Sequence, residues 1–157
     1  MTETVRLPEG FRVVPFEEKH LPDAVGIEQR CFSEPWDEKM FRLMFFPPAP
    51  TAYALAVTSP DGRLAAFGGV QYVLDEAEIL NIASSPEFRR LGCARAIMTG
   101  LDGFFVSHGI RKVWLEVRQS NLPAHELYLG MGFRDADLRR RYYSSPTEDA
   151  IIMLKEF

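Results

Sequence analysis

The stretch Ser85-Pro86-Glu87-Phe88-Arg89-Arg90-Leu91-Gly92-Cys93-Ala94 decides the fold, because it joins a strand-like segment to the clearest helical segment of the chain. Residues 76–83 before it have the composition of a strand. Residues 91–108 carry apolar side chains at helical spacing, and Gly109 ends that run. The first amides of a helix lack partners within the helix, so they can bind a phosphate where small residues let it approach. The stretch therefore predicts an anion-binding turn at the start of a helix.

Gly92 and Ala94 would give a ligand access to those amides, and Arg89 and Arg90 add positive charge that suits a pyrophosphate. A plainer interpretation is also open, in which Gly92 only marks the turn into the helix and both arginines are solvated. The segment has neither a Gly-Lys-Ser/Thr ending nor a Gly-x-Gly-x-x-Gly pattern. This disfavours a nucleoside triphosphatase and a dinucleotide-binding fold.

The rest of the chain alternates between strand-like and helical segments. We expect strands at residues 11–16, 52–58, 64–74, 76–83, 113–117, 133–143 and 149–154, and helices at 21–32, 37–45 and 91–108. A fourth helix should start at the cap residue Asn121 and end before Gly132. This order predicts the α/β class: a mixed central sheet of about seven strands, antiparallel in its first half, with a parallel strand pair at its centre and about four flanking helices. We expect residues 1–157 to form a single domain.

Composition narrows the classes of protein that the chain can belong to. Apolar residues make up 46% and charged residues 25% of 157 residues, which is typical of a soluble globular protein. No apolar run approaches the roughly 20 residues that cross a bilayer, and residues 1–10 lack a basic-then-apolar signal pattern. The net charge of −4 argues against a nucleic-acid partner and favours a basic protein or peptide. We expect a cytoplasmic protein that binds neither nucleic acid nor membrane.

Cysteine and histidine give no sign of a metal site. Cys31 and Cys93 lie far apart and form neither a redox nor a metal-ligand spacing, so we expect free thiols. His20, His108 and His125 also lack metal-ligand spacing, and we expect them at the surface.

The segment Trp114-Leu115-Glu116-Val117-Arg118 places a carboxylate inside a strand that otherwise has the pattern of a buried one. An unpaired buried charge is costly, so Glu116 should have either a partner or a task. One alternative is a salt bridge to Arg118 across the strand end. The other is catalysis.

Two motifs together resemble those of the GNAT superfamily of acetyltransferases. Arg89-x-x-Gly92-x-Ala94 is similar to its coenzyme A pyrophosphate loop, Gln/Arg-x-x-Gly-x-Gly/Ala, and residues 121–133 match its Asn-x-x-Ala-x-x-Leu-Tyr-x-x-x-Gly-Phe segment. On spacing alone, Tyr128 could equally be a core aromatic. The resemblance implies a GNAT fold that uses acetyl-CoA as acetyl donor without a metal. It implies cofactor contacts from Leu80, Asn81, Ile82, Ala83, Arg89, Arg90, Leu91, Gly92, Cys93, Ala94 and Asn121.

Within that superfamily the chain resembles the RimI-type group of ribosomal-protein-alanine acetyltransferases. The resemblance covers residues 27–36, 78–83, 114–118, 140–143 and 148–153. It implies transfer of an acetyl group to the N-terminal alanine of the eighteenth small-subunit ribosomal protein, with Glu116 as general base and Tyr128 as general acid. It also implies that Glu34, Trp36, Tyr142 and Tyr143 contact the acceptor. We expect the enzyme to be a monomer or weak dimer.

Alternatives remain open at this point. Trp36 could be a core anchor, and the arginines of residues 139–141 could be solvated. The acceptor could be a small amine or a lysine side chain, because the cofactor motifs are shared across the superfamily. The chain could also be a non-catalytic sensor of acyl-CoA.

Overall fold

The computed structural model describes residues 6–157, so the first five residues of the expected domain lie outside the described residues. Within that range the chain forms seven strands and four α-helices. The strands are β1 (Arg12–Pro15), β2 (Ala52–Thr58), β3 (Leu64–Val73), β4 (Glu76–Ser84), β5 (Lys112–Arg118), β6 (Arg134–Tyr143) and β7 (Glu148–Glu156). The helices are α1 (Leu21–Cys31), α2 (Glu38–Phe45), α3 (Cys93–Ser107) and α4 (Leu122–Gly130), with short 3-10 turns η1 (Glu18–His20) and η2 (Pro86–Phe88).

All seven strands form one sheet in the order β1-β2-β3-β4-β5-β7-β6. Strands β1 to β4 are antiparallel, β4 and β5 are parallel, and β5, β7 and β6 are antiparallel again. The predicted α/β fold is therefore confirmed, with its antiparallel first half and its central parallel pair. Helix α3 provides the crossover that a parallel connection requires.

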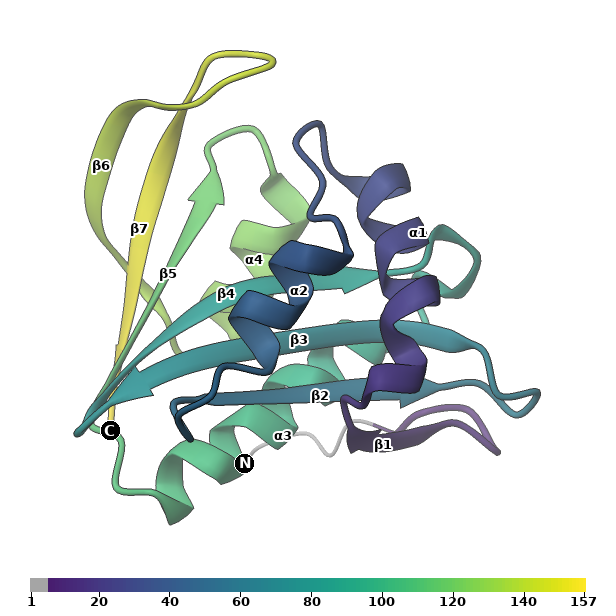
Figure 1. The fold of residues 1–157 in the computed structure, drawn as a ribbon. Helices are drawn as coiled ribbons and strands as arrows, with labels where there is room; N and C mark the ends of the chain where they lie inside the picture. The colour runs from purple at the N-terminus through teal and green to yellow at the C-terminus, as the bar shows by residue number, and fades with distance from the viewer. Residues whose placement is uncertain (1–5) are drawn as a thin grey trace.

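Strands β4 and β5 pair over only a short length. Residues 76–78 of β4 pair with residues 112–114 of β5, and beyond that point the two strands diverge (Figure 1). The divergence opens the middle of the sheet and leaves the later part of β4 without a neighbour on that side.

Helices cover both faces of the sheet. Helices α1 and α2 lie on one face and α3 lies on the other (Figure 1). In β5 the alternate residues Val113, Leu115 and Val117 are buried in the core on the α3 side. Because side chains alternate along a strand, Glu116 and Arg118 point to the opposite face, toward α1 and α2.

The core beneath α1 and α2 is built from aromatic rings. Phe41 and Phe67 are fully buried, and their centroids lie 5.3 Å apart with the rings nearly perpendicular. Phe45 packs against the same group and lies over Gly69 of β3. Deeply buried aromatic packing of this kind fixes α2, and with it the loop that precedes α2.

The element boundaries agree closely with those expected, and the differences have local causes. Helix α3 begins at Cys93 and not at Leu91, because Gly92 adopts a left-handed conformation (φ +83°) that a helix cannot contain. The expectation that His20 lies at the surface is wrong. His20 is buried, and its Nδ1 accepts a hydrogen bond from the Glu17 amide (2.8 Å) at the turn that leads into α1.

No helix within residues 6–157 is both long enough and apolar enough to cross a bilayer.

Candidate active site

A cleft of about 410 Å³ lies where β4 and β5 diverge. The loop between α1 and α2 and the hairpin between β6 and β7 contribute its other walls. The predicted site residues that line this cleft are Glu34, Trp36, Leu80, Asn81, Ile82, Glu116, Asn121, Tyr128, Tyr142 and Tyr143. The structure thus brings the expected catalytic, acceptor and part of the cofactor residues together. The remaining predicted cofactor residues lie along the chain from the end of β4 to the start of α3.

A β-bulge shapes the β4 side of the cleft. Asn81 pairs with Gly69 and Ile79 pairs with Val70, so Leu80 is an extra residue in β4. A bulge leaves the extra residue outside the regular ladder and re-aims its neighbours. Backbone groups near Leu80 are therefore available to a molecule in the cleft, since β5 has already diverged.

The start of α3 has the features of an anion site. Gly92 is the N-cap residue, and it provides no side chain to bond the first amides of this 15-residue helix. Arg89 lies just before it, with its Nη2 3.6 Å from Cys31 Sγ. Cys93 is buried in the core, so only its backbone can face a ligand. Free helix amides with an adjacent arginine fit a pyrophosphate.

Glu116 projects into the cleft and is partly shielded from solvent. Burial, with a further contribution from the charge of Glu78, raises its pKa, while Arg139 and Tyr142 oppose the rise. The alternative that Glu116 pairs with Arg118 is wrong, because Arg118 pairs with Glu148 (3.3 Å). Glu116 is thus a carboxylate held at the cleft surface with its basicity increased.

Tyr128 lies on α4, the helix that follows β5. It belongs to the core on the α3 side and also lines the cleft, so the core-aromatic alternative and the site assignment both describe it. Burial raises its pKa to about 12. Its phenol therefore stays protonated at neutral pH and can act as a hydrogen-bond donor.

Asn121 and Trp36 each have a structural role beside their place in the cleft. The Asn121 side chain caps α4 by accepting a hydrogen bond from the Ala124 amide (3.3 Å), as predicted. Trp36 packs edge-on against Phe41 and Phe45, with centroids 5.2 and 5.6 Å away. The core-anchor alternative for Trp36 is confirmed, and its place in the cleft wall is additional.

Two tyrosines at the end of β6 face the cleft. The Tyr142 and Tyr143 rings are perpendicular, with centroids 5.0 Å apart. Burial raises the pKa of both, and the negative charge of Glu116 adds to the rise. Glu34, on the facing loop, accepts a hydrogen bond from the Ser144 hydroxyl.

Sequence reasoning missed Glu28, a fully buried carboxylate on α1. Its Oε1 accepts hydrogen bonds from Asn81 Nδ2 (2.7 Å) and from the Trp36 amide (3.2 Å), while its Oε2 has no partner among the described residues. Burial raises its pKa to about 7. A signal existed, because Glu28 follows Ala24 and Ile27 on the apolar stripe of the expected helix.

Within residues 6–157, no group of three or more histidine, cysteine, aspartate or glutamate side chains is arranged to hold a metal ion.

Comparison with known proteins shows the family. The model of the acetyltransferase (GNAT) family matches residues 21–133. The chain belongs to the GNAT family. This GNAT acetyltransferase is 43% identical over 135 residues to a Salmonella typhimurium (strain LT2) protein named [Ribosomal protein bS18]-alanine N-acetyltransferase. The aligned residues cover 85% of this chain and 88% of that protein.

Solved structures give the same family. The crystal structure of the ribosomal-protein-S18-alanine N-acetyltransferase from Escherichia coli matches with a TM-score of 0.84 and 38% identity over 93% of both chains. Arabidopsis thaliana NAA60 in complex with acetyl-CoA matches with a TM-score of 0.83, covering 94% of this chain and 98% of that one. At 19% identity it shows a shared fold only. The expected resemblance to RimI-type GNAT acetyltransferases is confirmed.

Proposed function

We propose that this enzyme transfers the acetyl group of acetyl-CoA to the α-amino group of a protein whose first residue is small. We further propose that the acceptor is the N-terminal alanine of the eighteenth small-subunit ribosomal protein, because the names of the relatives give an alanine of that protein as the acceptor. The observation that carries the proposal is that Glu116 and Tyr128 line one cleft between diverging β4 and β5. The proposal treats residues 1–157 as one catalytic domain.

The donor would lie along β4 and reach the start of α3. In this arrangement the backbone of residues 89–94 and the Arg89 and Arg90 side chains hold the pyrophosphate. Backbone groups of Leu80, Asn81, Ile82 and Ala83 hold the rest of the donor and polarise the thioester carbonyl. Asn121 contributes from the start of α4. The bulge at Leu80 supports this placement, because it frees main-chain donors on that side of the cleft.

Glu116 would take the proton that the acceptor amine must lose. Its raised pKa makes it a better proton acceptor than a solvated glutamate. An α-amine has a pKa of about 7.7–8.0, so roughly a tenth is already neutral at pH 7, against less than about 0.1% of lysine side chains. A single carboxylate, acting directly or through a water, is therefore sufficient for an α-amine.

The reaction then needs one further proton. The amine nitrogen attacks the thioester carbonyl carbon, the carbon–sulfur bond breaks, and the amine proton passes to Glu116. Tyr128 donates to the departing sulfur, which its protonated state at neutral pH allows. Holding both reactants in the cleft supplies much of the remaining acceleration.

The acceptor wall suits a positively charged chain end. Glu34, Glu78 and Glu116 all line the cleft, and carboxylates attract an α-ammonium group and a basic segment behind it. Tyr142, Tyr143 and Trp36 narrow the same region, which favours a small first side chain.

The test is a panel of peptides incubated with acetyl-CoA and analysed by mass spectrometry. A peptide with the N-terminal sequence of the ribosomal protein should gain one acetyl group faster than peptides that begin with Ser or Met. A blocked peptide with an internal lysine should gain none. Failure of the ribosomal peptide alone refutes that acceptor. Faster acetylation of the lysine peptide would point to a lysine side chain as the acceptor, and the same assay with a small amine tests the remaining alternative.

Two variants test the catalytic roles. Glu116→Gln and Tyr128→Phe should each lower turnover by about 10²- to 10⁴-fold while acetyl-CoA affinity, measured by calorimetry, stays within about twofold. Unchanged turnover in either variant refutes that residue's role. Binding of acetyl-CoA by the parent protein with no thiol release in a single turnover would indicate a sensor.

A further inference from the structure

Two segments distant in sequence wall the acceptor side of the cleft. One is the loop between α1 and α2, which contributes Ser33, Glu34 and Trp36. The other is the β6–β7 hairpin, which contributes Tyr142 and Tyr143. Neither segment is joined to the other by the sheet, so side chains must fix the width of the cleft between them.

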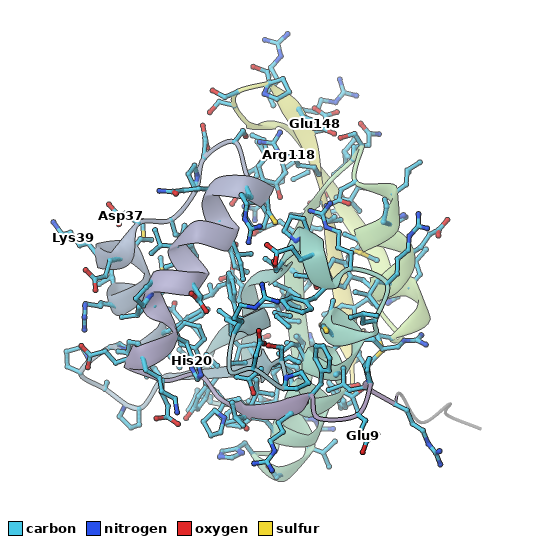
Figure 2. All side chains as sticks on the ribbon, turned by 90° about the vertical axis from the view of Figure 1, so that its right-hand side faces the viewer. Glu9, His20, Asp37, Lys39, Arg118 and Glu148 are labelled. Carbon is cyan, nitrogen blue, oxygen red and sulfur yellow. The ribbon has the colours of Figure 1, made fainter. Side chains whose placement is uncertain are left out.

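One guanidinium group bonds to both segments. Arg118, at the end of β5, donates from Nη2 to Ser33 Oγ on the loop and to the Ser144 carbonyl on the hairpin, both at 3.1 Å. From Nη1 it donates to the Pro146 carbonyl (3.2 Å) and to Glu148 Oε2 (3.3 Å). Figure 2 shows Arg118 and Glu148 close together beneath the turn that joins β6 and β7.

Neighbouring contacts hold the guanidinium in place. It stacks over the Tyr143 ring, with Cζ 4.3 Å from the centroid. Glu148 also accepts a hydrogen bond from the Ser120 amide, so this carboxylate is fixed from two sides. The Arg118 side chain is only 23% exposed, which strengthens these bonds relative to those of a solvated arginine.

The chemistry of the contacts requires arginine. The four acceptors are a hydroxyl, two carbonyls and a carboxylate, and a planar fork with five donors can reach all of them at once. A lysine in the same place would keep the charge but offer donors from a single nitrogen. The cluster is therefore built around the shape of the side chain as well as its charge.

We infer that Arg118 is a positioning residue that ties the α1–α2 loop to the β6–β7 hairpin across the acceptor side of the cleft. We call the contacts of Arg118 with Ser33, Ser144, Pro146 and Glu148 the Arg118 bridge. The bridge determines which part of an acceptor protein can enter the cleft. A free chain end can pass between the loop and the hairpin, whereas the middle of a chain can enter only if the two segments separate. This inference rests on the proposed function and adds a determinant of acceptor selectivity to it.

Kinetics of Arg118→Lys and Arg118→Ala test the bridge. Both variants should raise KM for the acceptor peptide by about tenfold or more and change kcat less than about threefold, with acetyl-CoA affinity unchanged. The preference for a free N-terminus over an internal lysine should narrow. If Arg118→Lys matches the parent enzyme, charge alone is sufficient and the bridge is wrong. Arg134→Ala, which removes an exposed ion pair with Glu156 on the same hairpin, is the matched control and should change neither constant.

Hydrogen exchange tests the same bridge without any acceptor. In Arg118→Ala, amides of residues 141–149 should exchange about tenfold faster or more, while those of α3 keep their protection. Unchanged exchange in the hairpin refutes the bridge even if the acceptor is correctly identified. Faster exchange in a protein that acetylates none of the peptides would refute the proposed function and leave the bridge supported. Glu148→Gln keeps a side-chain oxygen that can accept from the Ser120 amide but removes the charge that faces Arg118. This variant should give the same changes in KM and in hydrogen exchange more weakly, and no change would count against the bridge.

Discussion

Replacing Glu28 with glutamine should change how the stability of this protein depends on pH. Glu28 is fully buried, and burial raises its pKa from 4.5 to about 7. The folded protein therefore binds this proton more tightly than the unfolded chain does. Its contribution to stability is complete below about pH 4.5 and is lost as the pH rises through 7. Glutamine keeps a side-chain oxygen that accepts hydrogen bonds from Asn81 and the Trp36 amide, but it cannot titrate. The variant should therefore not lose this stability as the pH rises.

The size of the effect follows from the two pKa values. The difference between 4.5 and about 7 corresponds to about 3 kcal/mol of unfolding free energy over the full range. Part of that is already lost at pH 5, so between pH 5 and pH 8.5 we expect the parent protein to lose about 2 to 3 kcal/mol more than Glu28→Gln. For a protein of 157 residues this is roughly 5–10 °C in Tm.

Urea unfolding of both proteins at the two pH values measures this double difference. Other carboxylates titrate in both proteins, so their contributions to the unfolding free energy cancel in the difference. Glu9→Gln, an exposed position, is the control and should behave as the parent protein does. If the stabilities of Glu28→Gln and the parent protein vary in parallel with pH, then Glu28 is ionised in the folded protein at neutral pH, and the assignment of a buried protonated acid is refuted.

Three further outcomes follow from the packing and from the helix start. Gly69→Ala places a methyl group against three ring carbons of Phe45, so the unfolding free energy should fall by about 1–3 kcal/mol in urea; an unchanged value would mean that α2 moves freely. Gly92→Ala forces a side chain into a left-handed conformation (φ +83°) at the proposed pyrophosphate site, and calorimetry should show CoA affinity lowered by about tenfold. Gly103→Ala, where nothing lies within 4 Å of the added carbon inside α3, should leave that affinity intact and raise Tm, since glycine weakens a helix interior by about 1 kcal/mol; a fall in Tm would contradict this.

Much of the fold could be predicted from local patterns. The apolar residues of 113–117 indicated a buried strand, and the cap signal at Asn121 gave the start of α4. These features depend on residues a few positions apart, which is the range over which helix and strand periods act. The turn that we propose to bind the pyrophosphate could be recognised for the same reason, because Gly92 and the helix that follows it are adjacent in sequence.

The partners of the site residues could not be predicted in this way. Glu28 and Asn81 are 53 residues apart, and Arg118 and Ser33 are 85 apart. No periodic pattern reports which distant loop lies beside a strand end. The suggested pairing of Glu116 with Arg118 is wrong because Arg118 pairs with Glu148, which lies on a hairpin whose path depends on tertiary packing.

The brief pairing of β4 with β5 has a consequence for ligand-linked stability. Past residue 78, main-chain groups of β4 face a cleft where a neighbouring strand would otherwise bond to them. If the donor lies along β4 as proposed, it would bond to these main-chain groups in place of a neighbouring strand. Free CoA at a hundred times its Kd should then raise the free energy of unfolding by about 2.7 kcal/mol, and a thermal-shift assay can detect this linkage between the open edge of β4 and the stability of the fold.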